Sequence, residues 1–233
     1  MIDSSPSLQD ATLETACGRI RELSVKTRLE GPWASGCFDE LATRGVLARF
    51  VPIDGGATAA DESALLVVLV ALARVCLTTA LAISQWAAGV RLVAAADDTI
   101  RGRLLVDLAT GRRFTTVGVS QVTTSRRHLA TAPVVASRQS DDAADQLGDD
   151  DPGSWRIDGC CPWVTGGDSV DTIVTAAATS RDVGTRTATI DRTVADSSAF
   201  FLVDRTAPGV TVEPPLSLLA LSGSRTSRVQ FER

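Results

Sequence analysis

The sequence predicts an α+β protein: an N-terminal all-α helical domain over residues 1–112, followed by a small β-barrel or β-sandwich domain over residues 113–233. Two observations predict this. In the first part, hydrophobic residues recur at spacings of three and four, which places them on one face of a helix. Beyond Gly111 they gather instead in short segments rich in Val, Thr and Ile, which is typical of strands.

The first helix is expected over residues 7–29, where Leu13, Ala16, Ile20 and Leu23 share one face. Residues 51–56 contain a proline and two adjacent glycines, and they are expected to form a loop. The other expected helices are a short one at Phe38 to Thr43, one each at 62–76 and 79–95, and one that starts at Asp97 or Asp98 and ends at Gly111.

The longest apolar region does not predict a membrane span. Residues 63–73 and 75–90 carry no charge, but Arg74 separates them. Neither run reaches the roughly 18 apolar residues that a spanning helix needs. We therefore expect two buried helices with a break near Thr78.

Eight short strands are expected in the second half, and short strands at such close spacing are typical of a β-barrel or β-sandwich. They are expected at 114–120, 131–137, 154–160, 171–177, 185–191, 198–204, 209–213 and 227–232. An acidic run at 141–151 lies between two of them. Because it contains no glutamate to close a calcium loop, we interpret it as a solvated hairpin loop.

Composition excludes several kinds of chemistry. The formal net charge of -5 argues against a nucleic-acid partner, which would need a cationic surface. His128 is the only histidine, so a multi-histidine metal site is impossible and no metal is expected. His128 could alternatively act as a base, but the sequence shows no partner that would orient it.

The five cysteines are odd in number and no signal peptide precedes them, so a reduced, cytoplasmic compartment is expected. Cys160 and Cys161 are adjacent, which is the wrong spacing for a CxxC redox pair or a zinc ribbon. We expect both to be structural, since free cysteines are usually buried as small hydrophobes.

Four groups of motifs, in order along the chain, resemble the acyl-CoA dehydrogenase family. Phe38–Val46 with Val51-Pro52 and Gly55-Gly56 resembles its first helix pair, and Leu72–Ala82 its "LAR…ST-A-LA" junction. Trp155–Gly159 with Trp163–Gly167 is similar to its "W-x-L-x-G…W-V-T" hairpin. The closing strands of its middle domain resemble Phe201–Val203, Ala207–Val210 and Leu219–Thr226.

The resemblance implies an FAD-dependent oxidoreductase that dehydrogenates an acyl-CoA or acyl-carrier thioester. No side chain can accept the hydride, so a flavin is the expected acceptor. The resemblance also implies a further C-terminal helical domain that carries the catalytic glutamate, so no catalytic residue is assigned within these 233 residues. A flavin monooxygenase of the same fold, and a diverged non-catalytic partner subunit, are the alternatives.

The resemblance places the flavin against Trp163 and Thr165, with Ser120 and the backbone of Val119 on a neighbouring strand at its pyrimidine edge. Two residues apart on a strand, Trp163 and Thr165 would share one face. Packing in the core is the alternative role for Trp163. Ser125 belongs to the stretch that corresponds to the family's flavin-contacting turn.

That turn, Ser120–Arg127, keeps a leading hydroxyl but lacks the family's Pro, Gly and acid, and Ser222 stands where the family has Arg. Arg126 and Arg127 are candidates for the phosphates of a thioester carrier, because guanidinium groups suit phosphate oxygens. A solvated basic turn is the alternative.

The implied helical domain would cover apolar surface on this chain. Residues around Leu65–Val70 and Leu77–Ile83 are the expected contributors. A large exposed apolar patch marks a partner site, so we expect a homo-oligomer or a partner that supplies the absent helices.

Overall fold

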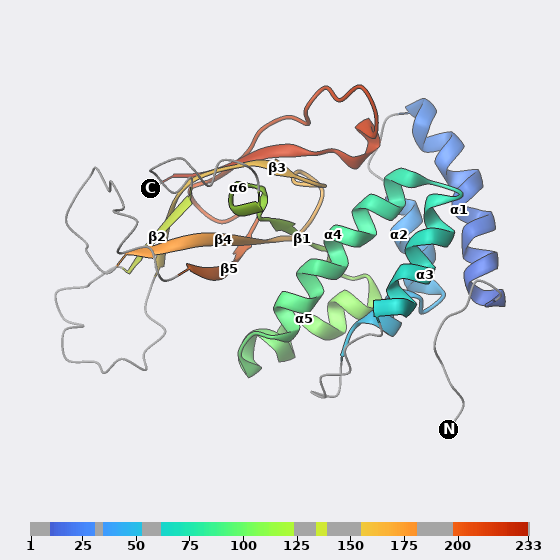
Figure 1. Ribbon diagram of the computed structural model, residues 1–233, viewed down its shortest axis with the longest axis horizontal. Helices are drawn as coiled ribbons and strands as arrows, with labels where there is room; N and C mark the ends of the chain where they lie inside the picture. The colour runs from blue at the N-terminus through green and yellow to red at the C-terminus, as the bar shows by residue number, and fades with distance from the viewer. Residues whose placement is uncertain are drawn as a thin grey trace.

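The computed structural model describes residues 10–30, 35–52, 62–123, 134–138, 155–180 and 198–232. The helices α1 to α5, within residues 11–110, occupy one end of the molecule and the strands the other (Figure 1). The last long helix ends at Thr110 and the first strand begins at Thr115. The expectation of a protein with both helices and a sheet, the helices coming first, is confirmed.

The helical end contains α1 (Ala11–Glu30), α2 (Ser35–Thr43), the 3-10 helix η1 (Leu47–Phe50), α3 (Glu62–Ala73), α4 (Leu77–Ala94) and α5 (Asp98–Thr110). Capping follows the sequence at α5. The Asp97 carboxylate accepts a hydrogen bond from the Ile100 N–H at 2.9 Å, so Asp97 is the cap. Gly111 ends the helix with a φ of 70°, a conformation that favours glycine.

The break between α3 and α4 lies earlier than predicted. The sequence predicted helices at 62–76 and 79–95 with a break near Thr78, but α3 ends at Ala73 and α4 begins at Leu77. Cys76 between them is extended, with a φ of -153°. Both ends of the break are apolar, so periodicity gave no signal for its exact position.

Helix α4 is the central helix of this end. It contacts α3, α5, the strand β1 (Thr115–Gly118) and the short 3-10 helix η4 (Ser222–Ser224) (Figure 1). In the described part of the chain it is the one helix whose length and composition would allow a membrane crossing, and half of that stretch is buried inside the fold. Its packing is that of a core helix, as expected.

The strands form one sheet in the order β1-β4-β2-β3-β7-β6, with β5 also paired to β4. Strands β1 and β2 run parallel to β4, and the other pairs are antiparallel. Their bounds are β1 Thr115–Gly118, β2 Val134–Arg138, β3 Trp155–Val164, β4 Thr172–Ser180, β5 Ser198–Asp204, β6 Val210–Val212 and β7 Ser227–Phe231. The expected strand at 185–191 lies outside the described residues.

The sheet is curled. Strands β3 and β5 are not hydrogen-bonded neighbours, yet the rings of Trp155 on β3 and Phe201 on β5 meet edge to face with centroids 5.4 Å apart. Two residues so placed can touch only if the strands between them curve. The apolar residues Ile157, Val203 and Val210 pack with these two rings on the concave side of the sheet.

The helices and the sheet are packed on each other. The helical core continues onto the sheet through Val117 of β1 and Val174 of β4. At the point of closest approach, a Cβ on Gly89 of α4 would lie 2.7 Å from Cγ2 of Thr115 on β1. Only a glycine lets the helix lie this close to the strand.

Several large apolar side chains are left exposed at the helical end. Leu66 and Val70 of α3 and Leu77 of α4 are exposed, whereas Val68 and Ile83 nearby are buried. Exposed apolar surface was expected in these two segments.

Candidate functional site

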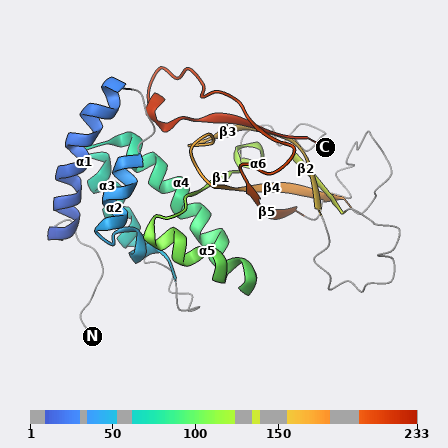
Figure 2. The same cartoon turned by 180° about the vertical axis from the view of Figure 1, so that it is seen from behind.

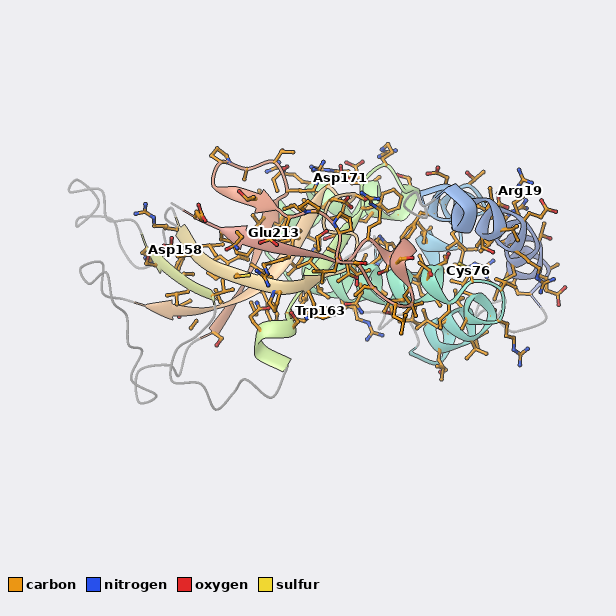
Figure 3. The ribbon with its side chains drawn as sticks, turned by 90° about the horizontal axis from the view of Figure 1, so that it is seen from above. Arg19, Cys76, Asp158, Trp163, Asp171 and Glu213 are labelled. Carbon is orange, nitrogen blue, oxygen red and sulfur yellow. The ribbon has the colours of Figure 1, made fainter. Side chains whose placement is uncertain are left out.

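A cavity of about 480 Å³ lies where the sheet meets the helices. Figure 3 labels Trp163, which lines it, in the middle of the molecule between the strands and the helices. Four segments supply its walls: α4, the end of β1 with the residues after it, the end of β3, and the loop before β7. The described residues that line it are Leu81, Gln85, Val117, Val119, Ser120, Trp163, Thr165, Leu218, Leu219, Ala220, Leu221, Ser224 and Thr226, and all of them are uncharged.

A bulge in β3 directs Trp163 outward. Cys161 and Val164 are both buried although they are three residues apart, and the pairing of β3 with β7 shifts register between them. The extra residue of a bulge breaks the strict alternation of faces, and Pro162 within it has no N–H to donate. The Trp163 side chain is 53% exposed, so the alternative of core packing is wrong.

Thr165 lies just beyond the end of β3, in the turn that follows Val164, and not two residues along the same strand as predicted. The two side chains nevertheless line the same cavity. The bulge and the turn together bring Trp163 and Thr165 to the same side, which the alternation of side chains along a strand was expected to do.

Ser120 is not on a strand either. Strand β1 ends at Gly118, and Ser120 begins the four-residue helix α6 (Ser120–Thr123). Val119 connects the two. The prediction of a strand over 114–120 therefore ran two residues too far. Val119 and Ser120 are half-buried and both line the cavity, facing the segment that carries Trp163.

Gln121 holds α6 in place. Its Nε2 donates to the carbonyl oxygens of Gly118 and Ala176, at 2.9 Å each, and so joins α6 to β1 and β4. The hydroxyl of Thr175 also donates to the Gly118 carbonyl, at 3.0 Å. These bonds fix the backbone of Val119 and Ser120 at the cavity wall.

Cys161 belongs to the same buried polar cluster and is structural. Its Sγ lies 3.2 Å from the Thr175 hydroxyl and 3.4 Å from the Gly118 carbonyl oxygen. Burial raises the pKa of the Cys161 thiol to about 11, so it stays protonated and unreactive at neutral pH. Cys160, on the other face of β3, is half-buried.

The opposite wall comes from the segment between β6 and β7, which arches from the sheet toward the helices (Figure 2). It ends in the 3-10 helix η4 (Ser222–Ser224). Beside the cavity, Arg225 pairs with Asp168. Burial raises the pKa of Asp168, but hydrogen bonds from Arg225 and Ser169 outweigh burial and hold that pKa below its ordinary value.

The structure thus brings Val119, Ser120, Trp163 and Thr165 to one cavity. The other predicted site residues, Ser125, Arg126 and Arg127, follow α6 and lie outside the described residues, as do His128 and the acidic run at 141–151.

Sequence reasoning missed Leu81 and Gln85 on α4, and also the wall formed by Leu218–Leu221. Gln85 left a signal, because it is a polar residue within the charge-free run at 75–90. Most of the loop lies in the motif Leu219–Thr226, but its place in the cavity wall depends on where the chain folds back, which the motif does not show.

A second hollow, of about 430 Å³, opens on the concave face of the sheet. Trp155, Phe201 and Val210 line it, and Arg156, Asp204 and Glu232 stand among its lining residues. Of the predicted site residues that the structure describes, Val119, Ser120, Trp163 and Thr165, none lines it.

No protein-family model and no curated protein sequence matched the chain. Solved structures do resemble it. Glutaryl-CoA dehydrogenase from Mycobacterium smegmatis, in complex with FADH2, superposes with a TM-score of 0.68 at 18% identity over 97% of this chain and 54% of that one. The chain has the fold of the acyl-CoA dehydrogenases.

Two other structures share this fold. KijD3, in complex with FMN and a dTDP-linked amino-keto sugar, has a TM-score of 0.67 at 22% identity, over 97% of this chain and 50% of its own. Dibenzothiophene monooxygenase (TdsC) from Paenibacillus sp. A11-2 has a TM-score of 0.67 at 15% identity, over 95% of this chain and 49% of its own. The chain spans about half the length of these proteins.

Proposed function

We propose that this chain is the flavin-binding part of a flavoprotein oxidoreductase. One observation carries the proposal. Val119, Ser120, Trp163 and Thr165, chosen from sequence motifs, lie around a single uncharged cavity with a half-exposed indole in its wall. The solved structures of the same fold contain FADH2 or FMN, which adds support.

The cavity fits an isoalloxazine ring. Its volume of about 480 Å³ lies within the usual range of small-molecule sites, and its uncharged lining suits a flat neutral ring. The Trp163 indole offers an apolar surface for stacking. The Thr165 hydroxyl and the backbone of Val119 and Ser120 offer polar groups for the ring's edge and nitrogens.

A bound flavin would supply the hydride acceptor that no side chain provides. The residues of this chain would bind and orient the ring. Leu81, Leu218 and Leu221 would offer apolar contacts beside it, and Gln121 would keep the β1–α6 link rigid. The proton-abstracting base is not assigned to any residue of this chain.

For the finer reaction we propose α,β-dehydrogenation of an acyl thioester with FAD, in line with the sequence motifs. A flavin monooxygenase is the second candidate, because TdsC is a monooxygenase of the same fold and KijD3 is known in complex with FMN. A partner subunit that has lost the chemistry is the third.

Equilibrium titration of the purified chain with FAD and with FMN tests the proposal. We expect saturable binding of a flavin, and Trp163→Ala should weaken it about tenfold through lost stacking. Trp155→Ala is the matched control, since Trp155 lines the other hollow and its loss should leave flavin affinity unchanged. Failure to bind either flavin would refute the proposal.

The preferred flavin separates the finer candidates. Tight FAD binding, with electron transfer from an acyl thioester to an artificial acceptor, supports dehydrogenation. Tight FMN binding, with oxygen uptake on an aromatic substrate, supports a monooxygenase. Flavin binding without either activity, in a full complex with its partners, supports the non-catalytic role.

A further inference from the structure

Two turns meet beside the cavity, and each continues into a part of its wall. The first is the β3–β4 turn, residues 165–169, which begins with Thr165. The second is the η4 turn, residues 221–226, which contributes Leu221, Ser224 and Thr226. One backbone hydrogen bond joins them, from the Gly166 N–H to the Ser224 carbonyl oxygen at 2.9 Å.

A fork-like ion pair makes the second connection. Nε of Arg225 donates to Oδ1 of Asp168 at 3.0 Å and to Oδ2 at 2.9 Å, and Nη2 also donates to Oδ2. The side chains are 30% and 22% exposed. The Ser169 hydroxyl donates to Asp168 Oδ1 at 2.7 Å, which fixes the carboxylate from the other side. Charge-assisted bonds of this geometry specify orientation as well as attraction.

The η4 turn needs such a restraint because its backbone is strained. Leu221 and Arg225, the residues on either side of η4, have φ values of 60° and 46°. Side chains with a Cβ rarely adopt this left-handed conformation, and they keep it only when the surroundings hold them there. Ser224 and Thr226, which flank Arg225 and line the cavity, have their hydroxyl oxygens 2.8 Å apart.

We propose that Asp168 and Arg225 are positioning residues. Their ion pair clamps the strained η4 turn to the β3–β4 turn and so sets the distance between the two walls of the cavity. The expected effect of this ion pair on ligand affinity rests on the proposed flavin-binding function. Its role in holding the two turns together does not depend on that function.

Two measurements separate the clamp from its effect on ligand affinity. Hydrogen exchange of the amides at 221–226 reports the clamp without any ligand, and flavin titration reports the cavity. In Asp168→Asn and in Arg225→Gln we expect exchange in this segment to rise about tenfold and flavin affinity to fall about tenfold, the size expected from a lost charge-assisted pair. The control is Arg112→Gln, which breaks the pair with Asp107 at the end of α5, away from the cavity.

Two further variants distinguish a clamp from general destabilisation. Arg225→Lys keeps the charge but loses the planar fork, so it should give an intermediate effect on both readouts. The double exchange Asp168→Arg with Arg225→Asp should recover much of the loss that each single change causes.

Unchanged exchange at 221–226 in Asp168→Asn and Arg225→Gln would overturn the clamp. Faster exchange with unchanged flavin affinity would overturn its role at the cavity. If the unmodified chain binds no flavin, the proposed function fails and the exchange measurement alone decides whether the clamp exists.

Discussion

Replacing Gly89 by alanine should test how tightly α4 is seated on the sheet. The new Cβ would lie 2.7 Å from Cγ2 of Thr115, a side chain that is fully buried in β1. Because Thr115 is branched at Cβ and enclosed by its surroundings, it cannot rotate away cheaply. Gln85, one turn earlier in α4, lines the cavity, so displacement of the helix would also move that wall.

Two effects of opposite sign set the magnitude. Overpacking in a close-packed interior costs about 2 kcal/mol. Exchange of glycine for alanine within a helix gains about 1 kcal/mol. The net expectation is a loss of about 1 kcal/mol in the free energy of unfolding, which corresponds to about 3 °C in melting temperature for a chain of this size.

The variant Thr115→Ser supplies the control, because it removes Cγ2 and keeps the hydroxyl that lies 3.4 Å from the Thr172 carbonyl oxygen. In that background the 2.7 Å contact is gone and the closest remaining one is with the hydroxyl oxygen at 3.3 Å, which needs only a small shift, so Gly89→Ala should stabilise the protein by less than the helix gain of about 1 kcal/mol. Urea unfolding of the four proteins, followed by circular dichroism, measures both effects. If Gly89→Ala has the same sign in both backgrounds, the close contact is not what holds position 89 as glycine.

Three shorter predictions follow from other parts of the molecule. The pKa of Asp168 is lowered in the folded protein, so the carboxylate contributes its full stability above the ordinary pKa of 3.8. That contribution is lost as the pH falls through the folded pKa. In urea unfolding, the difference in stability between the unmodified chain and Asp168→Asn should therefore shrink below about pH 4. Cys161, with its pKa near 11, should resist maleimide in the folded protein at neutral pH and react once urea unfolds it, as read by mass spectrometry. Leu66→Gln should reduce self-association in analytical ultracentrifugation, because Leu66 is part of the exposed apolar surface of α3; an unchanged sedimentation profile would show that this surface is not used.

Local features of the fold were largely readable from the sequence. The strand at Ser198–Asp204 has the bounds predicted for it, and α5 begins after its Asp97 cap and ends at Gly111. These features depend on turn and cap residues whose preferences are local. The break before α4 was misplaced because it was assigned to Thr78, whereas α3 already ends at Ala73, just before Arg74.

The arrangement of the cavity was only partly predictable. The motifs identified Trp163 and Thr165, but the reason they share a cavity is a bulge and a turn, which depend on pairing with β7. Ser120 was assigned to a strand because Val119 continues the β pattern. In the structure, Gln121 holds the chain in α6 through bonds to the nearby Gly118 carbonyl and to the Ala176 carbonyl, 55 residues away. Such bonds between distant residues cannot be inferred from periodicity.

The most direct test of the central claim is an NMR titration of the indole N–H groups with FMN and with FAD. Trp163 lines the proposed flavin cavity, Trp155 lines the second hollow, and Trp86 is buried in α4. We predict that the Trp163 resonance, assigned through Trp163→Phe, shifts and saturates while those of Trp155 and Trp86 stay in place. A saturating shift of Trp155 with Trp163 unmoved, or no shift at all, would contradict it.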